Sequence, residues 1–289
     1  PSLPKGKVIS ALSLVQKPKE PLLLPKPGRD CITCAVVANG GVLWRSKKGA
    51  EIDSHDYVFR SDHLNGAVTK GFEEDVGNRT DVYVHTACFS PGSDLVLYLL
   101  LSCDVVFQGI KYVLIPEGMR DFEWLTGLYK RERLTSETVP VLVSSPWTQY
   151  SGQFNETRFY VLHMDFLRYV RNRSLFLKSL KLQNDTWAIF RPSNGAFMMF
   201  MALHVCDTVD AYGFITENYK LYSNYYVERG AKTRVVFYEN HDYPLEMALW
   251  RRLHDLGIIH LYLGEPRETE RTAQPTTSAN ATHTKGKKS

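Results

Sequence analysis

The sequence lacks several short motifs that would each assign the chain to a known class of protein. No Gly-x-Ser-x-Gly occurs, so the nucleophile elbow of a hydrolase has no support. No Asp-x-Asp occurs, which removes the usual carboxylate pair that holds a divalent ion on a sugar diphosphate. The P-loop and the full dinucleotide-binding fingerprint are also absent. We therefore expect no bound metal or cofactor from these motifs.

Long apolar runs and a strong net charge are lacking as well. No apolar run approaches the ~20 residues that span a bilayer, and no signal peptide opens the chain. The net charge of +4 fits an anionic ligand but not the dense basic stripe of a nucleic-acid binder. With 289 residues and 44% hydrophobic content, the chain can bury one large core or at most two smaller ones.

Cysteine is scarce, since the chain has only five. At least one is unpaired if the others bridge, and Cys31-x-x-Cys34 lacks the second pair that a structural zinc site needs. Together with the cysteines, the Asn-x-Ser/Thr sequons favour a protein of the secretory pathway. These sequons begin at Asn78, Asn155, Asn172, Asn184 and Asn280.

The two ends of the chain differ in composition from its middle. Residues 1–29 are rich in Pro and Lys and are predicted to be a linker with a short helix near 8–15. The tail, 265–289, is rich in Thr and Lys without apolar periodicity, which predicts disorder. We therefore expect residues 30–264 to form a single folded domain.

Strands and helices alternate along this domain. Such alternation predicts an α/β fold with a mainly parallel sheet flanked by helices. The expected strands are 35–37, 57–60, 81–84, 112–115, 141–144, 187–190, 211–215 and 235–238. The expected helices are 94–101, 122–131, 164–180, 194–206 and 244–256.

The first strand runs directly into Asn39-Gly40-Gly41, which indicates a tight turn. Glycines after a strand let backbone N–H groups approach a ligand closely, as phosphate sites require. A plain turn is the commoner meaning of Gly-Gly on its own.

The helix predicted at 194–206 is apolar on nearly every side, which indicates burial against the sheet. Ser193 or Asn194 can cap its start, where free N–H groups and the positive end of the dipole suit a phosphate. A core helix with an ordinary cap is the alternative interpretation.

The last helix begins at Pro244, with Glu246 in its first turn and His241 just before it. The dipole at that end disfavours imidazolium and so helps to keep a neutral base available near pH 7. The alternative interpretation is a loop histidine that has a structural role or is simply solvated. Upstream, the tyrosines of Tyr222-Ser-Asn-Tyr225-Tyr226 can stack on a base or offer hydroxyls to a phosphate, although loop packing also explains them.

Four blocks in this order resemble the sialylmotifs of animal sialyltransferases, glycosyltransferase family 29. The large motif is similar to residues 34–80, and the small motif to residues 192–214, with Cys206-Asp207 and Ala211-Tyr-Gly-Phe. The third motif is similar to Tyr225-Tyr-Val-Glu228, and the very small motif to His241 with Glu246. The resemblance covers about residues 7–264. Cys31-Ile-Thr-Cys34 and Phe237-Tyr-Glu-Asn-His241-Asp resemble most the α-2,6-sialyltransferases that act on GalNAc α-linked to Ser or Thr.

This resemblance implies a GT-A-like α/β fold, with residues 1–29 as a stem remnant and truncated edge of a catalytic domain at 30–264. It implies a type II membrane protein of the Golgi lumen whose anchor lies outside this chain. It also implies a disulfide between Cys34 and Cys206, with Cys31 pairing upstream of residue 1. Cys88 and Cys103 match no family position.

The resemblance further implies CMP-sialic acid as donor and O-glycosylated glycoproteins as acceptors, with no metal and no nucleic acid. His241 would deprotonate the acceptor O6 while it attacks the anomeric carbon with inversion. Asn39 and Asn65 would contact the nucleotide and phosphate. The cytidine and sialic acid would meet Ser193, Asn194 and Gly195.

The sequence also departs from the family pattern at several positions. Residues 61–63 look like an insertion before the turn that carries Asn65, and Tyr225 stands where close relatives carry a histidine associated with the donor phosphate. Asn194 replaces a usual Thr or Ser, and Ala38 a usual Gly. Two alternatives therefore stay open: another acceptor, such as a glycolipid or α-2,8 transfer, and a catalytically silent relative that binds CMP or glycans.

Overall fold

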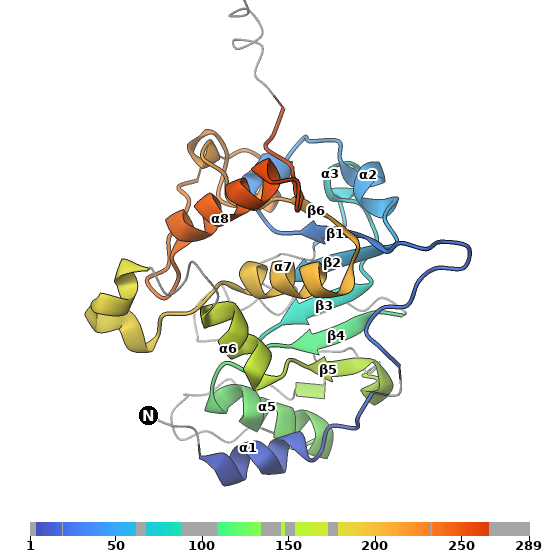
Figure 1. Ribbon diagram of the computed structural model, residues 1–289, viewed down its shortest axis with the longest axis vertical. Helices are drawn as coiled ribbons and strands as arrows, with labels where there is room; N and C mark the ends of the chain where they lie inside the picture. The colour runs from blue at the N-terminus through green and yellow to red at the C-terminus, as the bar shows by residue number, and fades with distance from the viewer. Residues whose placement is uncertain are drawn as a thin grey trace, which may run out of the picture.

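The computed structural model describes residues 4–18, 20–61, 68–87, 109–133, 146–147, 154–172, 179–231 and 233–265. Within them, seven strands form one sheet in the order β5-β4-β3-β2-β1-β6-β7, and every neighbouring pair is parallel (Figure 1). The predicted α/β fold with a mainly parallel sheet is thus confirmed. The strands are β1 Thr33–Val37, β2 Tyr57–Ser61, β3 Val82–His85, β4 Lys111–Leu114, β5 Phe159–Val161, β6 Thr208–Tyr212 and β7 His260–Leu261.

Three of the predicted helices are confirmed with slightly shifted ends, as α5, α7 and α8. The predicted helix 164–180 is described as α6 over Met164–Asn172, residues 173–178 are outside the described part, and Ser179 is not helical. The short helices α2 and α3 were not predicted. The helices are α1 Lys5–Leu12, α2 Gly49–Asp53, α3 Glu73–Val76, α5 Met119–Lys130, α6 Met164–Asn172, α7 Asn194–Val205 and α8 Tyr243–Asp255.

Two predicted strands are wrong. Residues 187 and 188 belong to a 3-10 helix at Asp185–Ala188, and residues 189 and 190 follow it without forming a strand. Residues 235–238 pair with no strand of the described part. Both are short apolar runs, whose period cannot distinguish a strand from other structure. The predicted strand 211–215 begins earlier, at Thr208, and ends before Gly213, whose φ of 71° breaks the extended chain. The short edge strands β5 and β7 were missed, and the predictions for 94–101, 141–144 and 266–289 lie outside the described residues.

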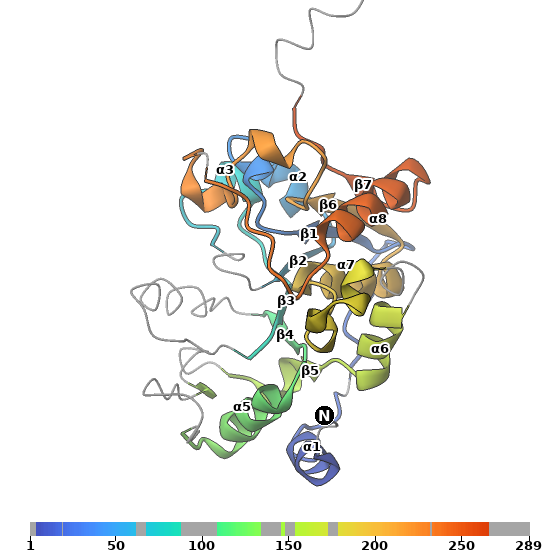
Figure 2. The ribbon, with the colours of Figure 1, turned by 90° about the vertical axis from the view of Figure 1, so that its left-hand side faces the viewer.

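Both faces of the sheet are covered, which explains why a strand such as β1 is apolar and buried along nearly its whole length. In β1, Cys34 and Val36 face one apolar cluster, whereas Ala35 and Val37 face another. Helix α7 lies across the first face, and its buried side chains include Phe197, Met198 and Met199 (Figures 1 and 2). The predicted burial of this helix is therefore confirmed.

Helix α1 packs beside α5 at the β5 end of the sheet (Figures 1 and 2). Ala11 is buried in a cluster with Phe122 and Leu125, and Val8 packs against the same cluster. Part of the Pro- and Lys-rich N-terminal segment thus forms an edge of the folded body. None of the helices in the described part is both long and apolar enough to cross a membrane.

His55 follows α2, and its Nε2–H donates to Asp210 Oδ2 of β6 at 2.7 Å. Burial lowers the pKa of His55, but the hydrogen bond and charge of Asp210 more than offset this, so the net pKa is raised. The stabilisation by this pair is then complete below the ordinary pKa of about 6.5 and is lost as pH rises through the folded value.

From pH 6 to 8, we expect the unfolding free energy of His55→Gln to fall by about 0.5–1 kcal/mol less than that of the wild type. Urea unfolding of both proteins at pH 5.5, 6.5, 7.5 and 8.5 measures this. Parallel pH dependences of the two proteins would contradict it.

Candidate active site

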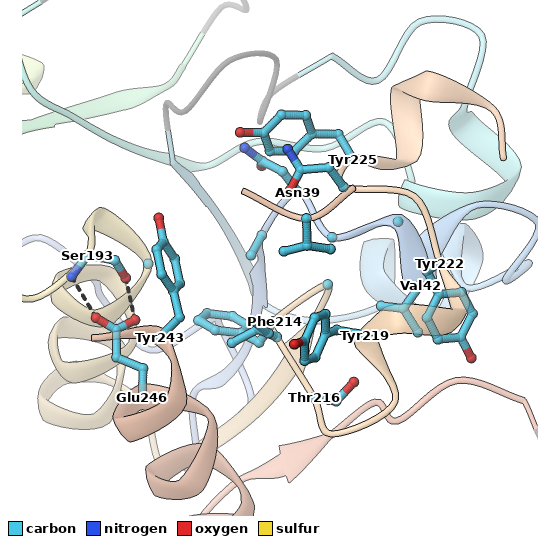
Figure 3. A pocket seen from close by; sticks show the side chains of 18 of the residues that line it. Asn39, Val42, Ser193, Phe214, Thr216, Tyr219, Tyr222, Tyr225, Tyr243 and Glu246 are labelled. Carbon is cyan, nitrogen blue, oxygen red and sulfur yellow. Dashed lines mark hydrogen bonds between the residues drawn. The ribbon is translucent and has the colours of Figure 1, made fainter. Parts of the chain in front are cut away.

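A cavity opens at the carboxyl ends of β1 and β6, where the sheet reverses its strand order. Parallel α/β sheets bind ligands at such a switch point, because the loops after the two strands diverge there. The empty space inside it is ≈ 970 Å³ with the solvent at its mouth included, a size suited to a small molecule. The walls come from the loop after β1, the start of α7, the loops after β6, and the start of α8 (Figure 3).

Six of the seven catalytic and donor-binding residues expected from the sequence line this one cavity. Asn65, the seventh, lies outside the described residues, as do Cys88, Cys103 and most of the 61–63 segment. Ser61, the last residue of β2, does reach the cavity. The residues brought together from separate parts of the chain are Asn39, Ser193, Asn194, Gly195, Tyr225 and His241.

The Asn39-Gly40-Gly41 turn forms the floor of the cavity against the protein's own backbone. Gly40 N–H donates to Gly213 O at 2.9 Å, and Asn39 O accepts from Tyr226 N–H at 3.1 Å. A Cβ on Gly40 would lie 2.4 Å from Gly213 O, and one on Gly41 would lie 2.1 Å from a backbone oxygen. The glycines are therefore required for close backbone approach inside the protein, rather than for a positive φ.

The start of α7 is held by residues from two other places in the chain. Ser193 Oγ accepts from Ala196 N–H at 3.1 Å and caps the helix as predicted. Glu246 of α8 accepts from Ser193 N–H at 2.8 Å and from Ser193 Oγ at 2.6 Å (Figure 3). The Glu246 carboxylate thereby fixes the helix end that faces the cavity.

His241 lies directly before Asp242, the N-cap of α8, and is buried. Its Nδ1 is 3.0 Å from Arg191 O. A carbonyl oxygen only accepts, so Nδ1 carries the proton of the neutral ring, and Nε2 is the basic nitrogen. The ring orientation is thus set by a backbone group near the start of α7.

Several tyrosines and one phenylalanine complete the walls. Tyr225 is placed in the cavity, and burial raises its pKa; the same cause raises the pKa of Tyr243, so both stay neutral donors at physiological pH. Tyr226, in contrast, is fully buried under the floor and donates to Val68 O at 2.7 Å. For Tyr226, packing within the protein, the alternative interpretation of the tyrosine cluster, therefore holds.

Several lining residues were not predicted as site residues, among them Phe214, Tyr238 and Tyr243. Phe214 was noted only within the small motif and the expected strand 211–215, and Tyr238 was assigned to an expected strand that does not form. A signal for Tyr243 did exist, because it stands between His241 and the helix-starting Pro244.

A disulfide joins Cys34 of β1 to Cys206 at the end of α7, the pair that the sialylmotif resemblance implies. Cys31 has an exposed free thiol in this chain. No cluster of three or more His, Cys, Asp or Glu side chains suited to a metal occurs within the described ranges.

Comparison with known families decides the class of the chain. The model of glycosyltransferase family 29 (sialyltransferase) matches residues 5–258, most of the chain. The chain belongs to glycosyltransferase family 29. The cavity described above is accordingly the candidate active site of a family 29 domain.

Similar family 29 proteins include the alpha-N-acetylgalactosaminide alpha-2,6-sialyltransferase 1 of Mus musculus, which is 45% identical over 83% of this chain and 44% of its own length. The alpha-2,6-sialyltransferase 2 of Mus musculus is 42% identical over 88% of this chain and 67% of its own length. A beta-galactosamide-alpha-2,3-sialyltransferase 1 of Sus scrofa is 30% identical over 84% of this chain and 61% of its own. The chain thus spans less than half the length of the first of these relatives.

The fold of this family 29 chain is also similar to a solved structure, the crystal structure of a mammalian sialyltransferase. The TM-score is 0.63 with 26% identity, over 90% of this chain and 79% of that one. A second structure with TM-score 0.61 is that of a mammalian sialyltransferase in complex with Gal-beta-1-3GalNAc-ortho-nitrophenol.

Glu246 is buried, with only 2% of the residue exposed. Burial raises its pKa to about 7, although the bonds from Ser193 act in the opposite direction. The folded protein therefore holds a proton that the unfolded chain releases between about pH 4.5 and 7, so stability decreases as pH rises through this window.

Between the two ends of this pH window, we expect the unfolding free energy of Glu246→Gln to fall by about 1–3 kcal/mol less than that of the wild type. Urea unfolding at pH 5, 6, 7 and 8 provides the test. The matched control is Glu73→Gln, since Glu73 is exposed at the start of α3. An unchanged pH dependence in Glu246→Gln would show that the buried carboxyl is ionised throughout.

Proposed function

We propose that this chain transfers sialic acid from CMP-sialic acid to O6 of GalNAc α-linked to Ser or Thr on O-glycosylated glycoproteins. The observation that carries the proposal is the convergence of His241 with five expected donor-binding residues in one cavity at the switch point of the sheet. The identity to alpha-2,6-sialyltransferases, 42–45%, exceeds that to an alpha-2,3-sialyltransferase, 30%, which favours this acceptor linkage.

In the proposed reaction, Nε2 of His241 takes the proton of the acceptor O6 hydroxyl as O6 attacks the anomeric carbon. A new C–O bond forms on one face, while the bond to the phosphate oxygen breaks on the other and CMP leaves with the electron pair. The anomeric configuration is therefore inverted. His241 is suited to this step, since Arg191 O holds the proton on the opposite nitrogen, Nδ1.

Negative charge that develops on the leaving CMP needs stabilisation. The start of α7 supplies N–H groups and the positive end of its dipole, and the Tyr225 hydroxyl offers a further donor. We infer that these groups replace a metal ion in this role. Asn39 and Asn194 would contact the nucleotide, with Gly195 and Ser193 beside it.

The same proposal includes a cellular setting. The chain would act in the Golgi lumen as the catalytic part of a type II membrane protein, because glycoprotein acceptors and the disulfide both fit a secretory compartment. Residues 30–264 would be the catalytic domain, preceded by a stem remnant.

The deciding experiment is transfer from CMP-sialic acid to desialylated mucin, with and without EDTA, followed by linkage analysis of the product. We expect product linked α-2,6 to GalNAc at an EDTA-insensitive rate. Another linkage, or transfer to glycolipid alone, would replace the acceptor assignment. CMP binding without any transfer would instead support a catalytically silent relative.

A further inference from the structure

The loop that carries His241 is held from both sides by residues that line no part of the cavity. This loop, residues 239–242, connects a segment without sheet pairing to the start of α8. A short loop of this kind does not by itself fix the direction of a side chain. The position of His241 therefore depends on what the loop is attached to.

On the C-terminal side of His241, the loop is attached to Ser179. Its side chain is 4% exposed, and its Oγ donates to Asp242 Oδ2 at 2.5 Å. The other carboxylate oxygen of Asp242 accepts from Leu245 N–H at 3.2 Å and so caps α8. The Asp242 carboxylate therefore holds the residue that follows His241 to two places, the start of α8 and Ser179. Nearby, Lys181 Nζ donates to Glu239 O at 3.0 Å.

At Asn240 and at His241 itself, the loop is attached to the backbone of Arg191. Its N–H donates to Asn240 O at 2.9 Å, and its carbonyl accepts from His241 Nδ1–H at 3.0 Å. Both bonds depend on where residue 191 lies.

The Arg191 side chain is paired with the Glu117 carboxylate, in the loop after β4. The backbone of that loop is itself fixed, since Asp121 Oδ2 accepts from Glu117 N–H at 3.0 Å and from Gly118 N–H at 2.8 Å. Asp121 is 6% exposed and caps α5. An unbroken set of contacts therefore leads from the end of β4 to the imidazole.

We propose that Ser179 and Glu117 are positioning residues that orient His241, Ser179 through Asp242 and Glu117 through Arg191. The inference rests on the proposed function, in which His241 is the base. Proton transfer requires the acceptor hydroxyl within hydrogen-bond reach of Nε2, and a misplacement of about 1 Å can cost ~100-fold in rate. Neither Ser179 nor Glu117 lines the cavity, so we expect loss of either to affect the chemical step and not donor binding.

The test compares Ser179→Ala and Glu117→Gln with the wild-type chain. We expect each to lower kcat about 10- to 100-fold, with KM for CMP-sialic acid and Kd for CMP within about twofold of wild type. The matched control is Ser54→Ala, since Ser54 Oγ donates to Glu51 O at 2.6 Å at the end of α2, outside the cavity. This control removes an equivalent hydroxyl bond and should leave kcat unchanged.

Two kinetic outcomes would overturn the proposal. A kcat within twofold of wild type in both variants would show that His241 keeps its orientation without them. A raised KM for the donor at unchanged kcat would assign the residues to donor binding. Equal losses in Ser54→Ala would trace the effect to general stability, and the positioning role would again fail.

A second readout does not depend on turnover. In ¹⁵N-edited NMR of histidine-labelled protein, the Nδ1 proton of His241 should exchange slowly in wild type and be broadened or lost in Ser179→Ala and Glu117→Gln. An unchanged signal in both variants would overturn the positioning role even if the wild-type chain transfers no sialic acid. Inactivity of the wild type would contradict the proposed function alone, so the two failures are distinguishable.

Discussion

Replacing His241 by alanine is expected to lower kcat for sialic acid transfer about 10³-fold or more while Kd for CMP changes little. His241 is the histidine that lines the cavity among the described residues, and its protonated Nδ1 leaves Nε2 as the basic atom. General base catalysis contributes typically 10²–10⁴-fold. Among the described residues, Glu246 is the acidic side chain that lines the cavity, and it is engaged by Ser193.

The measurement is steady-state transfer together with calorimetric titration of CMP. His163→Ala is the matched control, since His163 precedes α6 and 78% of its side chain is exposed. Added imidazole should restore part of the lost rate in His241→Ala, because the truncation leaves space at the same place. Retention of more than a tenth of wild-type kcat would assign the base to another group.

Loss of the disulfide is the second large effect that we expect. Cys34 and Cys206 are 172 residues apart in sequence, so their bond removes much of the freedom of the unfolded chain. The chain-entropy relation gives about 5 kcal/mol for a loop of this length, and measured losses of native disulfides run about 2–5 kcal/mol. The bond also holds the end of α7 to β1, and α7 starts at the cavity.

We therefore expect the Cys34→Ala/Cys206→Ala double variant to lose about 3–5 kcal/mol of unfolding free energy, measured by urea unfolding. Cys31→Ala is the control, since this thiol is exposed and unpaired in the structure and its loss should change stability by less than about 0.5 kcal/mol. A loss below 1 kcal/mol in the double variant would show that apolar packing alone holds α7 on β1.

The parts of the fold that were predictable are those with strong local signals. Helix α8 has Pro244 at its start, one apolar stripe and Gly257 after its end, and α7 is apolar over its whole length. The predictions failed where an apolar run was short. Trp187, within a 3-10 helix, and Ile189, just after it, are 58% and 57% exposed, and Val235 lines the cavity without joining the sheet. Four apolar residues do not define a period, so burial could not be inferred from them.

The sequence by itself determined the family, through four ordered motifs, and with it the residues to look for. It also determined the strand-to-turn transition at Asn39 and the capped start of α7 at Ser193, since both depend on neighbouring residues only.

The tertiary structure alone decided how these pieces act together. Glu246 reaches Ser193 across 53 residues of sequence, and His241 is oriented by a carbonyl 50 residues away. After β1, Gly40 lies against the backbone of Gly213 and Gly41 against that of Ser223, and Tyr226 is buried while its neighbour Tyr225 lines the cavity. Such contacts join residues that are distant in sequence, and the local periodicities and caps that can be recognised in a sequence do not specify which distant partner each residue meets.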